Sequence, residues 1–123
     1  MTASSLPAIT LHDRDYNDLL LHAILARRQG VANPAFLFGK LRRAQVCALV
    51  DLPDGVVSIG ARVRYRLGDQ AFTRTLLLPD EAALRPDGIS IATPLGTALL
   101  GLRVGDSMAF AADNGRRLVL VEH

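Results

Sequence analysis

The chain has 123 residues and a mass of 13.2 kDa, which suits one compact domain or a small domain with an appendage. That length excludes a TIM barrel and a pair of full α/β domains. Half of the residues are apolar, but aromatic residues make up only 5% and Trp is absent. The core must therefore be aliphatic, and base stacking by aromatic side chains is poorly supported.

The charge is small in sum and uneven along the chain. A net charge of +2 is low for a dedicated nucleic-acid-binding protein. Residues 27–74, however, hold nine basic and three acidic side chains, a net +6, so the rest of the chain sums to −4. The basic middle favours a partner with a negative surface, which either a protein or a nucleic acid could supply.

The chain shows no sign of export or membrane insertion. Residues 1–5 lack a basic stretch followed by an apolar one, and no apolar run approaches the roughly 18 residues that span a bilayer. The single cysteine, Cys47, can form no intramolecular disulfide and is expected to be a small sheet or core residue. We therefore expect a soluble cytoplasmic protein.

Two helices are predicted near the N-terminus. The first is capped by Asp13 or Asp15, carries apolar residues at helical spacing and ends at Gly30, so that it spans about 22 Å at about 1.5 Å per residue. The second begins at Asn33 and Pro34 and runs for about ten residues. The short connection between them predicts an antiparallel helical hairpin.

After residue 44 the apolar period changes from helical to twofold, which predicts strands. The clearest strand is 62–67, and the others are expected over residues 45–50, 56–59, 71–78, 89–92, 107–111 and 118–121. A single helical turn is expected over 79–84. A short helix is expected to start at Thr93 as cap with Pro94 at its first position, and to end at Gly101.

These elements predict an α+β fold. A short antiparallel helical hairpin over residues 1–45 precedes an antiparallel sheet with one short helix over residues 46–123.

Catalytic and metal-binding patterns are missing from the sequence. The three histidines, His12, His22 and His123, have no further ligand near them and are expected to be solvated. The serines show no nucleophile elbow, and no glycine-rich loop could hold a phosphate. We therefore expect no metal, no cofactor and no enzymatic activity.

Arg62, Arg64 and Arg66 alternate with apolar residues and so share one face of the predicted strand. Two interpretations stay open. The arginines either form a solvated face that prevents edge pairing, or they form a positive stripe that contacts a partner.

Residues 89–106 contain a short predicted strand followed by the motifs Thr-Pro-Leu-Gly, Ala-Leu-Leu-Gly and Val-Gly-Asp. With these motifs the segment resembles the C-terminal domain of the GreA/GreB transcription elongation factors. Four further segments, 41–46, 56–59, 61–65 and 73–76, resemble the short-armed Rnk subfamily, known as regulators of nucleoside diphosphate kinase. The resemblance covers roughly residues 9–122. It implies an FKBP-like sheet domain, although fold alone does not imply prolyl isomerase activity.

The resemblance implies docking on RNA polymerase near its secondary channel. Ser90 and Pro94 match the family's docking element, with Thr93 as a weaker neighbour, and Arg27 and Arg28 could contact acidic polymerase surface or nucleic acid. In Gre factors, acidic residues at the tip of a long hairpin help to hold a catalytic metal ion. The tip here, residues 26–33, contains no carboxylate.

We therefore expect a polymerase-binding regulator that competes with Gre-type factors without stimulating transcript cleavage, and without sequence-specific nucleic-acid binding. The alternative is a regulator that acts on nucleoside diphosphate kinase, or on nucleotide metabolism, through protein contacts.

Overall fold

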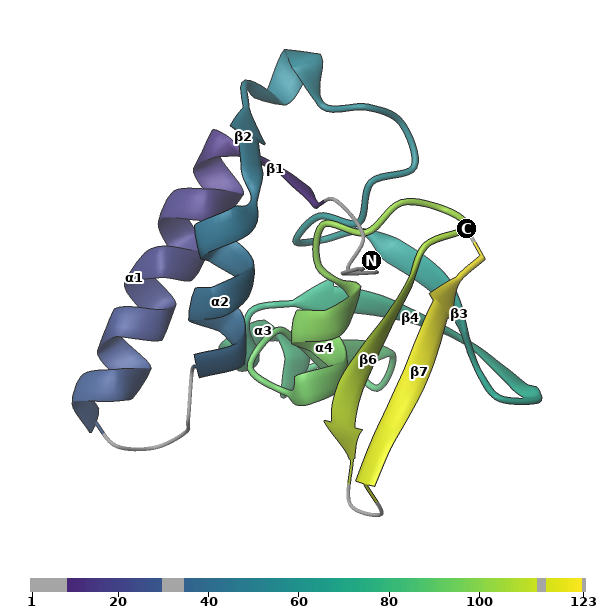
Figure 1. Cartoon of the computed structure of the whole chain (residues 1–123). Coiled ribbons are helices and arrows are strands. Elements are labelled where there is room, and N and C mark those ends of the chain that lie inside the picture. The colour runs from purple at the N-terminus through teal and green to yellow at the C-terminus, as the bar shows by residue number, and fades with distance from the viewer. Residues whose placement is uncertain (1–8, 30–34, 113–114, 123) are drawn as a thin grey trace, which may run out of the picture.

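The computed structural model describes residues 9–29, 35–112 and 115–122 (Figure 1). The elements follow one another as β1 (Thr10–His12), α1 (Asp13–Gln29), α2 (Ala35–Arg43), β2 (Gln45–Cys47), η1 (Leu49–Asp51), β3 (Arg62–Leu67), β4 (Gln70–Leu77), α3 (Pro79–Ala82), β5 (Gly88–Ser90), α4 (Pro94–Leu99), β6 (Ser107–Ala112) and β7 (Gly115–Val121). The chain thus combines helices with a β-sheet, and the predicted α+β fold is confirmed.

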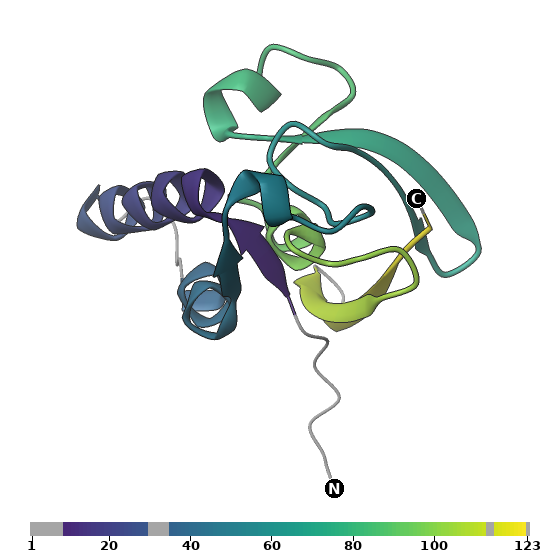
Figure 2. The same ribbon diagram turned by 90° about the horizontal axis from the view of Figure 1, so that it is seen from above.

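The predicted N-terminal helices are α1 and α2, which lie side by side (Figures 1 and 2). Asp13 and Asp15 occupy the first turn of α1, where the helix dipole favours negative charge. Basic side chains occupy the last turn of α2, where the dipole favours positive charge. The terminator and cap expected at Gly30, Asn33 and Pro34 lie outside the described residues.

A short strand that was not predicted from the sequence precedes the hairpin. β1 pairs in parallel with β2, from Thr10 opposite Gln45 to His12 opposite Cys47. The two-stranded ribbon of β1 and β2 therefore holds the start of α1 close to the end of α2. The strand predicted over 45–50 stops at Cys47, as expected a sheet residue, and the chain continues into the 3-10 turn η1.

The main sheet has the strand order β5-β4-β3-β7-β6 and curls strongly (Figure 2). The predicted hairpin of β3 and β4 is confirmed, with Arg62 opposite Thr75 and Leu67 opposite Gln70. β6 and β7 form a second antiparallel hairpin. The expected sheet differs at one edge, because β5 joins β4 in parallel after a connection that includes α3.

The strand predicted over 56–59 is wrong. An isolated bridge between Val56 and Arg103 is the only pairing found for it in the described chain. Val57 donates its N–H to Leu102 O at 2.8 Å, and Gly60 donates to Leu76 O at 2.6 Å, so the segment bonds to two separate parts of the chain. Val56 and Val57 are buried and Ile59 is half-buried, but the segment forms no regular ladder.

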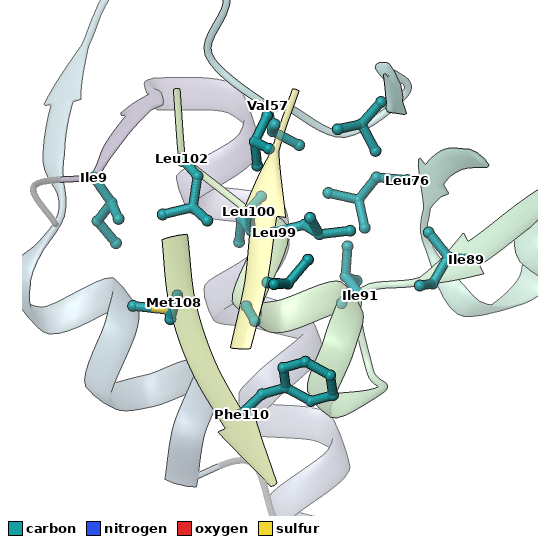
Figure 3. Close-up of a cluster of buried hydrophobic side chains, with 14 of the residues drawn as sticks. Ile9, Val57, Leu76, Ile89, Ile91, Leu99, Leu100, Leu102, Met108 and Phe110 are labelled. Carbon is teal, nitrogen blue, oxygen red and sulfur yellow. The ribbon is translucent and has the colours of Figure 1, made fainter. Parts of the chain in front are cut away.

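Buried and mostly aliphatic side chains form one core cluster, and Figure 3 shows part of it around α4 and the sheet. The cluster draws Leu19 from α1, Leu41 from α2 and Leu99 from α4, together with residues of the sheet. The division of the chain at residues 45 and 46 stays a prediction. Across the described part of the chain, none of the helices has the length and apolar character needed to cross a membrane.

Candidate partner-binding surfaces

The corner between β5 and α4 holds Ser90, Thr93 and Pro94 close together. Thr93 and Pro94 are exposed and Ser90 is half-buried. Thr93 caps α4 as predicted, because its Oγ1 accepts from Gly96 N at 3.0 Å. The same hydroxyl donates to Ser90 O at 2.7 Å, and Ser90 Oγ accepts from Ala92 N at 3.0 Å. The corner is therefore fixed by its own hydrogen bonds while its outer side stays open to a partner.

Tight packing beneath the corner holds it in place. A Cβ at Gly96 would collide with the carbonyl oxygen of Ser90, so glycine permits α4 to approach β5. Thr97 Oγ1 donates to Ile91 O at 2.7 Å, and the side chains of Ala98 and Leu99 are fully buried. Much of the sequence motif around the corner thus serves architecture, whereas Thr93 and Pro94 are presented on the surface.

The arginines of β3 share the outer face of the sheet, as predicted, since Val63 and Tyr65 point into the core. They are not equivalent. Arg64 Nε lies 3.1 Å from Glu122 Oε1, and Arg66 Nε lies 2.8 Å from Glu122 Oε2. These bonds, that of Arg66 first, hold the pKa of Glu122 below its usual value. Glu122 therefore neutralises part of the charge of the stripe. Arg62 differs from Arg64 and Arg66 because it is not bonded to Glu122.

Arg27 and Arg28 lie in the last turns of α1, which supports the predicted position of these cations at a helix C-terminus. Their side chains lie outside the described residues. The 17 residues of α1 give a length of about 25 Å, close to the expected value. Within the described chain, no three His, Cys, Asp or Glu side chains come together where they could hold a metal ion.

Sequence reasoning missed a buried lysine. Lys40 of α2 is 2% exposed, and its Nζ donates to Thr97 O at 2.7 Å and to Ala98 O at 2.6 Å. Burial, and next the charge of Arg43, hold the pKa of Lys40 well below its usual value. The two carbonyls belong to the last turn of α4, so Lys40 ties the hairpin to the helix of the candidate docking corner. The helical spacing from Leu37 placed Lys40 on the apolar face of α2, which is the signal that could have found it.

The prediction that His12 is solvated is wrong. His12 ends β1, is buried, and accepts a bond from Asp15 N through Nδ1 at 3.3 Å. Asp15 Oδ2 lies 3.2 Å from His12 Nε2 and accepts from Ile59 N at 2.9 Å. Burial raises the pKa of the Asp15 carboxyl against the effect of these partners. The pair joins the start of α1 to the irregular segment before β3, and this role is structural.

The part of the chain that carries these surfaces matches a known protein family. Residues 52–122 match the family described as transcription elongation factor GreA/GreB, C-terminal. This match contains β3 to β7, and therefore both the β5–α4 corner and the arginines of β3.

A relative that matches most of the chain extends the likeness to the hairpin. The chain is 36% identical to the "Regulator of nucleoside diphosphate kinase" of Escherichia coli (strain K12), over 90% of this chain and 83% of that protein. It is 38% identical to the transcription elongation factor GreA of Desulfovibrio desulfuricans over 72% of this chain and 57% of that protein. The names of these two relatives describe a regulator and an elongation factor rather than catalysts.

A solved structure agrees with the sequence comparisons. It is described as "Prokaryotic transcription elongation factor GreA/GreB from Nitrosomonas europaea" and superposes with a TM-score of 0.75 at 27% identity. The superposition covers 94% of this chain and 97% of that one, so it includes hairpin and sheet alike. The chain belongs to the GreA/GreB family of transcription elongation factors.

Proposed function

We propose that the protein is a transcription regulator that binds RNA polymerase near the secondary channel and competes there with Gre-type factors. The observation that carries this proposal is the β5–α4 corner of a GreA/GreB-family chain. Its residues Thr93 and Pro94 are exposed, while hydrogen bonds from Thr93 and Ser90 fix the backbone. A preorganised, exposed corner suits protein docking because little conformational entropy is lost on binding.

The proposed regulator does not stimulate transcript cleavage. Residues 26–33, which begin in the last turn of α1, include no Asp or Glu. A tip that delivers a divalent cation needs carboxylate oxygens as ligands. The protein would therefore occupy a binding site of Gre factors without supplying their catalytic groups, and would act as a non-enzymatic competitor.

A second candidate function comes from the name of one relative, a regulator of nucleoside diphosphate kinase. Under this alternative the same exposed surfaces would contact the kinase, or another protein of nucleotide metabolism. The two candidates differ in their partner, and a binding experiment separates them.

The test is binding to purified core RNA polymerase with an authentic Gre factor as competitor. We expect saturable binding that the Gre factor displaces, and no transcript cleavage in backtracked complexes. Pro94→Ala should weaken binding, whereas Pro86→Ala, at an exposed proline of the loop before β5, should not. Exchange of Arg62, Arg64 and Arg66 for Glu, with a salt titration, measures how far the stripe contributes.

Two results would contradict the proposal. One is the absence of saturable binding at micromolar concentration, and the other is simultaneous binding of this protein and the Gre factor. Retention of purified nucleoside diphosphate kinase on the immobilised protein would then favour the second candidate.

A further inference from the structure

Strand β7 extends beyond its neighbour β3. The ladder between them runs from Tyr65 opposite Val121 to Leu67 opposite Val119, whereas β7 begins at Gly115. Residues 115–118 are paired to β6 on one side and, within the described chain, to no strand on the other. Figure 1 shows the β3–β4 hairpin leading away from this part of β7. The open side of residues 115–118 is therefore a short sheet edge that could pair with another strand.

A hollow lies beside this edge. It is lined by Leu118 and Leu120 as its apolar part and by Arg66, Gly68, Arg116 and Arg117. Leu118 is 58% exposed and Leu120 is half-buried, so the hollow presents apolar surface to the solvent. As far as the described chain extends, none of the lining residues is acidic.

Arg116 and Arg117 give the edge a positive field, whereas the charge of Arg66 is partly neutralised by Glu122. Arg66 is held in place, because its Nε donates to Glu122 at 2.8 Å and its Nη1 to Asp69 O at 3.4 Å. Arg116 and Arg117 are exposed on the open segment itself. Basic side chains on an edge strand repel basic partners and select acidic ones.

We propose that residues 115–118 of β7 accept an extended acidic segment of a partner protein as an added strand. Main-chain bonds to the open edge would supply affinity, Arg116 and Arg117 would select carboxylates, and the hollow over Leu118 would take an apolar side chain. A nucleic-acid strand fits less well, because none of the described residues that line the hollow is aromatic and could stack on a base.

This surface is separate from the proposed docking corner. The open edge belongs to β7, whereas the corner is formed by the end of β5 and the start of α4, so the two surfaces share no residue. The inference does not rest on the proposed function, and neither Arg116 nor Arg117 belongs to the β3 stripe.

The test uses the full chain and a fluorescent peptide of about ten residues, enough to span an edge strand. Pairs of adjacent Glu residues in it are separated by Val or Leu, because Arg116 and Arg117 are consecutive and face opposite sides of the strand. Fluorescence anisotropy measures its affinity. We expect the Arg116→Glu, Arg117→Glu double variant to weaken binding about 10-fold or more, because two charge contacts become repulsive. The matched control is Arg42→Glu, Arg103→Glu, which changes two exposed arginines elsewhere and should leave affinity unchanged.

Two further measurements test whether the peptide pairs with the edge as a strand. A peptide with N-methylated alternate amides should bind at least about 10-fold more weakly, because it cannot complete the ladder. Amide hydrogen exchange in residues 115–118 should slow when the unmodified peptide binds.

The proposal is overturned if no saturable binding occurs up to about 1 mM. It is also overturned if the N-methylated peptide binds equally well, or if the control variant weakens binding as much as the edge variant. Tighter binding of a single-stranded RNA oligonucleotide than of the peptide, lost in the edge variant, would assign the surface to nucleic acid instead.

Discussion

At the scale of single residues, Lys40 shows how one buried cation can join two parts of a chain. Its ammonium group has lost almost all contact with water and is held by the carbonyls of Thr97 and Ala98. The negative end of the α4 dipole takes the place that a carboxylate partner usually has. The position of the helical hairpin is thereby coupled to the helix that begins at Thr93.

Replacement of Lys40 by Met should lower the free energy of unfolding by about 1–3 kcal/mol, because two buried carbonyls lose their donor. Urea unfolding followed by circular dichroism measures the change. Arg42→Met is the control, since Arg42 lies on the exposed side of the same helix and should change stability by less than about 0.5 kcal/mol. Equal effects of the two substitutions would show that the Lys40 bonds contribute nothing.

The depressed pKa of Lys40 gives this contribution a pH dependence. The folded-state pKa lies well below the ordinary value of 10.5, so between the two the unfolded chain binds more protons than the folded one. The stability contributed by Lys40 is therefore fully present above pH 10.5 and is lost as the pH falls through the folded-state pKa. Wild type should gain stability relative to Lys40→Met as the pH rises towards 10.5. A difference that stays constant over this range would refute the coupling.

At the scale of elements, the β5–α4 corner depends on a close approach that only glycine allows. Gly96→Ala should destabilise the protein by about 1–3 kcal/mol, because its Cβ would collide with the backbone of Ser90. Gly39→Ala is a matched control within α2, where a Cβ meets nothing within 4 Å. It should stabilise the protein by about 0.5–1 kcal/mol through helix propensity. Thermal unfolding of both variants tests the contrast, and a tolerated alanine at Gly96 would show that the corner is not tightly packed.

Elements with strong local signals could be predicted from the sequence. The alternation over Arg62–Leu67 and the Thr93–Pro94 helix start depend on neighbouring residues, so both were found. β1 could not be predicted, because three residues form a strand only against β2, which follows both helices. The parallel entry of β5 likewise depends on the path of a connection rather than on the residues of the strand.

The candidate site divides in the same way. Ser90, Thr93 and Pro94 carry a motif that the sequence displays, and the structure brings them together at one corner. The bonds of Glu122 to Arg64 and Arg66 are long-range contacts, and an alternating pattern cannot indicate which arginines will be paired. The same holds for Arg117, because only the different lengths of β3 and β7 leave it at an open edge.

At the scale of the whole molecule, the hairpin and the sheet share their buried contacts. Leu19 and Leu41 of the hairpin belong to the same apolar cluster as Leu99. Lys40 and the bond from Ile59 N to Asp15 add polar connections across the same boundary. We therefore expect neither the hairpin nor the sheet to be stable without the other.

We therefore predict that the whole chain unfolds in one cooperative transition. Tyr16 lies on α1 and Tyr65 on β3, and no Trp obscures their fluorescence. In the Tyr16→Phe variant the remaining Tyr65 signal reports on the sheet, while far-UV circular dichroism follows the helices as well. The two denaturant curves should coincide in midpoint and slope, because loss of the shared core removes support from both parts at once. A hairpin that melts before the Tyr65 signal changes would show that the arm is only loosely joined to the sheet. Docking through the β5–α4 corner would then leave the orientation of the arm undetermined.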